Sequence, residues 1–223
     1  MLHSAIEASI SKHPPVARTR TPQRILEMAL ELFNQHGEPN VTTNRIADEL
    51  DMSPGNLHYH FKTKQSLIEA LFGEFERQML ELLGGDPFER ADVEDAWLFL
   101  HLVFETIAGY RFIYRDLNEL CGRDRDLRRR FRGILKLSMR TASDLLEALE
   151  RAGHCQKGTA RNEPVIRNIV LIASYWISFD QVLEPRQEPR PGRAAIQVMS
   201  IVSPYLQGAA KDQFELLAAA YRD

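Results

Sequence analysis

The chain of 223 residues has only two cysteines, Cys121 and Cys155, which lie far apart without a partner motif. Their scarcity excludes a disulfide framework and a cysteine-based metal site, and favours reduced thiols in a cytoplasm. Long hydrophobic runs are also absent, since the longest, 169–177, is too short to cross a bilayer. The first twenty residues lack the apolar core of a signal peptide. We therefore expect a cytoplasmic protein with no membrane contact.

Motifs of the common enzyme classes are absent as well. No glycine-rich phosphate loop follows a strand pattern, and no G-x-S-x-G elbow occurs. His58 and His60 are two positions apart, which places them on different sides of a helix and makes them poor joint metal ligands. The Asp and Glu residues are scattered, without a pair suited to catalysis. We expect no enzyme activity, no cofactor and no metal site.

A net positive charge, which would attract nucleic acid without regard to sequence, is also absent, because the formal net charge is −3. Residues 1–64 hold seven bases and seven acids, and residues 65–120 hold four bases and twelve acids. Any contact with DNA must therefore come from local placement of charge. The basic run 123–140 favours the solvated face of a helix over a second nucleic-acid site, because apolar residues interleave with the bases.

Helical periodicity runs through most of the chain, with no strand pattern and no internal repeat. Thr21 caps a first helix, Pro22 opens it and Gly37 closes it. Residues 1–19 favour a flexible arm, for which a solvated tail and an arm that contacts DNA are equally open. Further long helices are expected at 64–83, 93–109, 112–121, 124–152, 163–182, 193–206 and 210–221. We therefore expect an all-α fold.

Residues 42–64 have the spacing of two short helices joined by a tight turn, followed by the start of a third. This is the layout of a DNA-reading helix-turn-helix. Ile46 and Leu50 share one face of the first short helix. Ser53 is a natural N-cap for the second, with Pro54 at the first helical position, where its missing N–H does no harm.

The second short helix turns Leu57 and Phe61 to the same side, so its opposite face carries Gly55 and Tyr59. Glycine at this place lets the backbone approach a phosphate or a base edge closely. No acidic residue occurs in 53–64. Periodicity alone leaves open a generic three-helix core with a solvated outer face.

One set of residues in this region stands in a distinctive order and spacing. The set is Arg24, Ile25, Leu26, Ala29, Leu30, Glu31, Leu32, Phe33, Gly37, Val41, Thr42, Thr43, Ile46, Ala47, Ser53, Pro54, Gly55, Asn56, Leu57, Tyr59, His60, Phe61, Lys62, Thr63, Lys64 and Leu67. On these residues, positions 20–68 resemble the N-terminal domain of the TetR family of bacterial transcription regulators. One departure is His58, where the family usually has Tyr, so the contact made at this position stays open.

The resemblance implies a regulator with a helix-turn-helix DNA-binding domain at 20–66 and a helical ligand-binding and dimerisation domain at 67–223. It implies a homodimer that binds a palindromic operator through two copies of the 53–60 helix. A small effector bound in the second domain would move the bridging helix 64–83 and end repression. The residues expected at double-stranded DNA are Thr42, Thr43, Asn44, Arg45, Ser53, Pro54, Gly55, Asn56, His58, Tyr59, His60, Lys62 and Lys64.

The helix at 163–182 is apolar nearly all round and must therefore be covered on every side. We expect a homodimer interface there, formed by Ile166, Ile169, Ala173 and Ile177. The same helix leaves open a different class of protein, an all-α adaptor that binds only other proteins.

Aromatic residues cluster in the segments expected to line an effector cavity. Each ring taken singly is better explained as core, but the set suits an apolar pocket for a small organic effector. His101, Asn118 or Arg115 would supply a polar contact. The expected pocket residues are Phe72, Phe75, Trp97, Phe104, Tyr110, Tyr114, Tyr175, Trp176 and Phe179.

Overall fold

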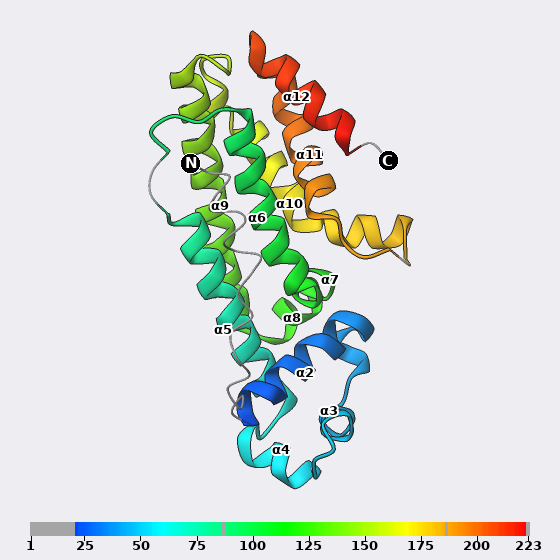
Figure 1. Ribbon diagram of the computed structural model, residues 1–223. Helices are drawn as coiled ribbons and strands as arrows, with labels where there is room; N and C mark the ends of the chain where they lie inside the picture. Colours follow the sequence, from blue (N-terminus) through cyan, green and yellow to red (C-terminus); the bar gives the residue numbers. More distant parts are fainter. Residues whose placement is uncertain (1–20, 86–87, 186, 222–223) are drawn as a thin grey trace.

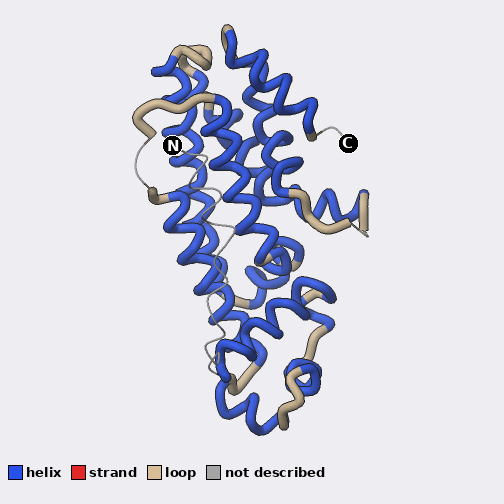
Figure 2. Tube along the Cα trace, in the orientation of Figure 1, coloured by secondary structure: helices blue, strands red, loops and turns tan. Residues whose placement is uncertain are grey.

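The computed structural model describes residues 21–85, 88–185 and 187–221 (Figure 1). Within these ranges the chain is helices and loops, apart from one isolated antiparallel bridge between Cys155 and Leu206 (Figure 2). The all-α prediction is confirmed. The arm predicted at 1–19 lies outside the described residues.

Three helices, α2 (Thr21–His36), α3 (Thr43–Glu49) and α4 (Pro54–His60), form the lower end of the molecule in Figure 1, and we call them the head. The single turn η1 (Glu38–Asn40) joins α2 to α3. Apolar positions at helical spacing meet in the centre of the head, which explains why the three short helices hold together. The fully buried side chains are Ile25, Ala29, Phe33, Val41, Ile46, Ala47 and Leu57.

Helix α5 (Lys64–Leu83) leads from the head into the rest of the molecule and has the predicted bounds. It starts with a capping box, in which Thr63 Oγ1 accepts the N–H of Ser66 at 3.1 Å and Ser66 Oγ accepts the N–H of Thr63 at 3.3 Å. Its 20 residues span about 30 Å at about 1.5 Å per residue. One rigid element therefore belongs to both ends of the molecule.

Helix α6 (Val93–Gly109) also has the predicted bounds, with Asp92 as its N-cap. The next predicted helix, 112–121, is instead two short helices, α7 (Arg111–Arg115) and α8 (Leu117–Arg123). The break is at Asp116, whose Oδ2 accepts the N–H of Glu38 at 3.0 Å. The two residues are 78 positions apart in the sequence, so the local periodicity could not predict this contact.

The remaining helices follow the predicted order, and their ends differ from prediction by four residues at most. The last turn of the predicted 193–206 helix is a separate 3₁₀ turn, η3 (Ser203–Tyr205), because Pro204 has no N–H to continue the α-helix. The turn η2 (Thr159–Arg161) lies in the predicted loop 153–162. The helices are α9 (Arg125–Ala152), α10 (Glu163–Leu183), α11 (Pro191–Val202) and α12 (Ala209–Ala220).

Helices α6 and α9 to α12 form a bundle above the head, which we call the body (Figure 1). Helix α11 packs on α6 and α10, α9 packs on α5 and α10, and α12 covers the outer side of α6 and α11. The short helices α7 and α8 lie between the body and the head, and α7 contacts α2 directly. The head thus contacts the rest of the molecule through α5 and through the α7–α8 segment.

Candidate DNA-binding surface

The turn between α3 and α4 is closed by backbone and capping hydrogen bonds. The N–H of Met52 donates to the carbonyl of Ala47 at 3.0 Å, which ends α3. Ser53 Oγ then accepts the N–H of Asn56 at 3.2 Å and starts α4, with exposed Pro54 at its first position. The predicted helix-turn-helix caps are therefore present, and they set the angle at which α4 leaves the turn.

The outer face of α4 is open to solvent on the side that was predicted from the sequence. Leu57 points into the core and is fully buried, whereas Gly55, Asn56 and Tyr59 are exposed. Tyr59 is 82% exposed, a high value for an aromatic ring. Apart from its chain neighbours and the backbone of its own helix, no heavy atom lies within 4 Å of the position that a Cβ would take at Gly55. A second molecule can therefore approach the α4 backbone here.

The two histidines of α4 lie in different surroundings. His58 is exposed, and its Nδ1 is 3.3 Å from the carbonyl oxygen of Lys62. His60 is half-buried and meets the Tyr59 ring edge-on, with ring centroids 5.1 Å apart. His58 is thus placed for a contact, while His60 supports the orientation of Tyr59.

The predicted contact residues at the start of α3 also differ in their exposure and in their contacts within the head. Thr42 and Asn44 are exposed, and Thr43 is half-buried. Thr42 Oγ1 accepts the N–H of Arg45 at 3.2 Å and so caps the helix. The Arg45 guanidinium lies 2.8 Å from His36 Nε2, at the end of α2. Arg45 is therefore held against the head, and Asn44 has the freer side chain.

The two predicted phosphate-binding lysines have different positions. Lys62 is exposed and has no ion pair within the described ranges. Lys64 Nζ lies 2.9 Å from Glu38 Oε1 and donates to the Glu38 carbonyl at 2.5 Å. Its side chain is only 26% exposed. The ammonium group of Lys64, which was predicted to bind phosphate, therefore already has a buried carboxylate as its partner inside the molecule.

Glu38 is the centre of a polar contact between the head and the body. Its side chain is 1% exposed, and Oε2 lies 2.6 Å from Arg123 Nη2 at the end of α8. Its backbone N–H donates to Asp116, between α7 and α8. With Lys64 at the start of α5, one residue of η1 contacts both connections to the body. The sequence analysis missed this group, because an isolated Glu in a loop has no distinguishing pattern.

Two arginines of α7 hold the C-terminal end of α2. Arg115 donates to the carbonyls of Phe33 at 2.5 Å and Asn34 at 3.3 Å, and Arg111 Nε donates to Asn34 O at 3.3 Å. A guanidinium suits a helix C-terminus, where carbonyls lack partners and the helix dipole is negative. Arg115 had been considered as a polar contact for an effector, but the structure uses it to fix the head.

Four residues predicted to line an effector pocket instead form part of the solid core. Phe72 and Phe75 are fully buried, and Tyr110 and Tyr114 are 7% and 4% exposed. Contacts between the rings fill the space, because the Phe75 ring centroid lies 5.6 Å from that of Tyr110 and 5.7 Å from that of Tyr114. Burial raises the pKa of the Tyr114 hydroxyl. These rings line none of the described cavities, and their burial agrees with the core alternative.

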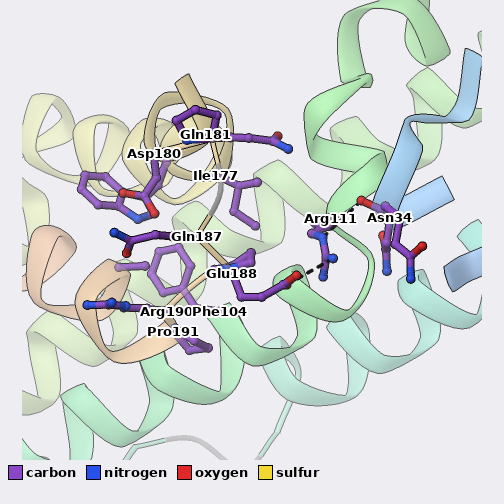
Figure 3. A pocket seen from close by; sticks show the side chains of 15 residues that line it. Asn34, Phe104, Arg111, Ile177, Asp180, Gln181, Gln187, Glu188, Arg190 and Pro191 are labelled. Carbon is purple, nitrogen blue, oxygen red and sulfur yellow. Dashed lines mark hydrogen bonds and ion pairs between the residues drawn. The ribbon is translucent and has the colours of Figure 1, made fainter. Parts of the chain in front are cut away.

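The other five aromatic residues are dispersed. Phe104 and Trp176 line one wall of a cavity of about 200 Å³, which we call the polar cavity (Figure 3). Tyr175 borders an open groove between α9 and α10. Trp97 stacks on His101 with centroids 4.9 Å apart, and Phe179 is 56% exposed. The nine rings therefore do not form one pocket.

A second cavity, of about 80 Å³, lies between α6, α9, α10 and α11, and we call it the apolar cavity. Its two hydroxyl groups already donate to carbonyls: Ser138 to Ile134 at 3.0 Å, and Thr141 to Leu83 at 2.9 Å and Leu137 at 3.0 Å. The other lining residues are apolar and include none of the nine predicted rings.

The four residues predicted for the dimer interface lie on one face of α10, and the structure turns this face inward. Ile169 and Ile177 are 7% and 6% exposed, while Ile166 and Ala173 are half-buried. Ile169 and Ala173 line the apolar cavity. At about 100° per residue, four exposed large apolar or aromatic side chains of α10 lie on the opposite face. They are Leu171, Tyr175, Phe179 and Val182, which we call the α10 stripe.

No cluster of three or more His, Cys, Asp or Glu side chains suited to a metal ion occurs in the described part of the chain. Cys121 and Cys155 are both free thiols. Burial raises the pKa of each, so the reactive thiolate is disfavoured at neutral pH. Among the helices of the described ranges, none combines the length and the hydropathy of a membrane span.

Comparisons with known proteins agree with this geometry. A TetR-family transcriptional regulator from Marinobacter aquaeolei VT8 has a crystal structure that superposes with a TM-score of 0.83 at 30% identity, over 92% of this chain and 100% of that one. The "SmeT-Triclosan complex" superposes with a TM-score of 0.55 at 16% identity, over 85% of this chain and 93% of that one, which shows a shared fold.

Curated relatives match a shorter region. The "Uncharacterized HTH-type transcriptional regulator in dhlA 5'region" of Xanthobacter autotrophicus is 34% identical over 99 residues, 44% of this chain and 47% of that protein. The "Probable HTH-type transcriptional regulator YttP" of Bacillus subtilis (strain 168) is 30% identical over 110 residues, 45% of this chain and 52% of that protein. The chain thus spans about half the length of these curated relatives.

The fold and the exposed α4 face fit the class of DNA-binding transcription regulators. A family model described as "Bacterial regulatory proteins, tetR family" matches residues 25–71, and the TetR model described as "Bacterial transcriptional repressor" matches residues 74–214. Because the second match alone covers more than half of the chain, the protein belongs to the TetR family. This membership confirms the resemblance seen in the sequence and removes the support for a protein-only adaptor.

Proposed function

We propose that the protein represses transcription by binding a palindromic operator as a homodimer, and that a small apolar or amphipathic effector releases it from the DNA. The proposal is carried by the exposed face of α4, with Tyr59, Asn56 and the open backbone at Gly55. Such a face fits the major groove, where side chains reach base edges while nearby cations such as Lys62 hold the phosphates. We place this activity in the cytoplasm.

We further propose that the functional division falls near residue 66, within α5. Residues 20–66 would contact the operator, and residues 67–223 would bind the effector and the second subunit. Leu67 and Ile68 of α5 are buried beside the head core, while Met79 and Leu83 are buried in the body. A displacement of the upper end of α5 would therefore reach the head as a change in its position.

The α10 stripe is the proposed dimer interface. Its members Leu171, Tyr175, Phe179 and Val182 are 55%, 43%, 56% and 82% exposed. A continuous apolar stripe in contact with water marks an interaction surface, and a second copy of α10 related by a twofold axis would cover it. Two heads on one twofold axis match the symmetry of a palindromic operator.

The apolar cavity is the proposed effector site. It is smaller than the roughly 150 Å³ that holds a benzene-sized guest, so an organic effector must push the surrounding helices apart. Leu83, at the end of α5, lines it, and Thr141 is hydrogen-bonded to the Leu83 carbonyl. Expansion of the cavity would thus act on α5. The two heads of the dimer would have one spacing that fits the operator and another that does not. The effector can shift the equilibrium between these two states only if it binds one of them more tightly than the other. The structural relative with triclosan supports an apolar effector class.

Selection of genomic DNA fragments on the purified protein, followed by sequencing, tests the repressor proposal. The expected result is an enriched inverted repeat, whose binding by the protein falls steeply with salt. Recovery of fragments without a shared sequence would contradict an operator. Transcription from the recovered promoter should rise when the gene for the protein is deleted, and a fall would indicate an activator.

The effector site is tested with the recovered operator in a mobility-shift screen of small organic molecules. An active molecule should release the DNA, and the operator should weaken binding of that molecule by the same factor. The cavity-filling variant Ala142→Leu should keep operator binding and need a higher concentration of the molecule for release, because Ala142 lines the cavity. Unchanged release from this variant would place the effector elsewhere.

A further inference from the structure

The polar cavity, distinct from the apolar one, lies where the head meets the body (Figure 3). Its walls are the last turns of α10, the chain at Pro185 and 187–190, the start of α11, the end of α2, Phe104 of α6 and Arg111 of α7. Its volume of about 200 Å³ exceeds that of the apolar cavity. Polar and aromatic side chains both line it, so its occupant must present both kinds of surface.

Asp180 is a lining carboxylate whose charge is only weakly compensated. Its side chain is 14% exposed, and no described residue donates a hydrogen bond to its buried Oδ1. The Arg193 guanidinium approaches only to 4.0 Å. Asp180 also lies in the last turn of α10, where the helix dipole disfavours an anion. A buried carboxylate oxygen without a donor is costly, and a bound cation with N–H groups would remove that cost.

Two arginines, Arg111 and Arg190, line the same cavity, and both already have partners. Arg111 Nε donates to the Asn34 carbonyl, and Arg111 Nη2 lies 3.2 Å from Glu188 Oε2 (Figure 3). Glu188 is 81% exposed, so its carboxylate is well solvated besides this contact. Arg111 therefore already has acceptors, whereas the Oδ1 of Asp180 has no hydrogen-bond donor.

Two rings of the lining suit an organic cation. Trp176 precedes Asp180 by one helical turn, and Phe104 faces the cavity from α6. The faces of such rings attract ammonium and amidinium groups, and their edges and neighbours Ile177 and Pro191 offer apolar contact.

We propose that the polar cavity binds an amphipathic organic amine or amidine, whose N–H groups donate to the Asp180 carboxylate and whose apolar part packs against Trp176 and Phe104. This inference concerns a second ligand site and does not depend on the repressor proposal, because its test contains no DNA.

Titration calorimetry of the purified full chain with three probes of the same shape tests the site. The probes are 2-phenylethylamine, 2-phenylethanol and phenylacetate, which differ in the charge of one end. We expect the amine to bind about 10- to 100-fold more tightly than the alcohol, the range that a hydrogen bond to a charged group supplies. Phenylacetate should bind more weakly than both, because Asp180 repels it.

Two matched variants assign the preference to one carboxylate. Asp180→Asn keeps the shape of the side chain and should bring the affinities of amine and alcohol to within about twofold. Glu188→Gln removes the other carboxylate of the lining and should leave the preference for the amine unchanged. Circular dichroism checks that each variant is folded, and the comparison of probes on the unaltered protein needs no variant.

Three results would overturn the inference. Equal affinity of the unaltered protein for amine and alcohol would show that Asp180 does not act as the counter-charge. Tightest binding of phenylacetate, lost in Arg111→Gln, would show an anion site instead. Absence of amine binding at millimolar concentration would show that the cavity is not a site for this class of ligand.

Discussion

At the scale of single residues, a mutation of Tyr59 can test DNA recognition without a change in stability. Its ring is 82% exposed and contributes little to the core of the head. Tyr59→Ala should therefore weaken specific operator binding by about 1–3 kcal/mol, because it removes a contact to the DNA while the fold stays intact. Fluorescence anisotropy on the selected operator measures the loss, and the thermal midpoint should not change. Unchanged affinity in the folded variant would show that α4 does not use this residue.

Lys62→Ala is the matched comparison, since Lys62 is an exposed cation at the end of the same helix. It should lower affinity for all sequences alike and reduce the salt slope by about one, as expected for one phosphate contact. A change in the preferred sequence would assign Lys62 to base recognition instead.

Glu38 is the residue on which the connection between head and body depends. Glu38→Gln removes the buried charge that lies between Lys64 and Arg123. We expect the free energy of unfolding to fall by about 1–3 kcal/mol, less than for a fully buried pair because both cations are partly exposed. Urea denaturation measures this change.

The control for Glu38 is Glu119→Gln. Glu119 is 58% exposed and lies 3.6 Å from the same Arg123, so its loss should change the free energy of unfolding by less than about 1 kcal/mol. Equal effects of the two variants would mean that burial of Glu38 has no special role.

At the scale of the secondary-structure element, α9 depends on the cap that starts it. Asp124 Oδ1 accepts the N–H groups of Asp126 at 2.8 Å and Leu127 at 3.0 Å, and Oδ2 accepts from Gln65 of α5 at 2.7 Å. Asp124→Ala should lower the free energy of unfolding by about 1–2 kcal/mol, whereas Asp124→Asn, which can still cap, should cost less. Thermal melts compare the variants, and an equal loss in both would show that charge, not capping, is responsible.

The element scale also shows what local sequence can predict. The bounds of α5 and α6 were predicted correctly, because each begins at a capping residue, Thr63 or Asp92, that acts within three positions. The single helix predicted at 112–121 was wrong, because the chain breaks at Asp116, which bonds to Glu38. Caps are local signals, whereas a break imposed by a distant contact leaves none in the periodicity.

At the scale of the whole molecule, the α10 stripe should determine the oligomeric state. Leu171→Asp places a charge on the stripe, so it should produce monomers in sedimentation experiments at micromolar concentration and abolish tight binding to a palindrome. Leu80→Asp, on the exposed side of α5, is the control and should leave the dimer intact, because Leu80 is 43% exposed outside the stripe. A wild-type monomer at this concentration would contradict the proposed interface.

The candidate site was partly predictable from the sequence. The residues whose surroundings were not predicted are those with partners far along the chain. The exposed face of α4 follows from residues within one short helix, so Gly55, Asn56 and Tyr59 were placed correctly on its outer side. Lys64 and Arg115 were assigned to ligands, although their partners lie inside the molecule, 26 and 82 residues away along the chain. When the partner of a charged side chain lies far along the sequence, sequence analysis treats that side chain as free to bind a ligand.

The sequence by itself determined the helical class, most helix bounds, the caps and the family, because all of these depend on residue type at short spacing. Only the tertiary structure decided which face of α10 is exposed, because a helix that is apolar on every side carries no periodic signal for the side its neighbours cover. It also decided that Phe72, Phe75, Tyr110 and Tyr114 fill the core and that two separate cavities remain. Cavities are what packing leaves unfilled, so they depend on the positions of all the helices at once.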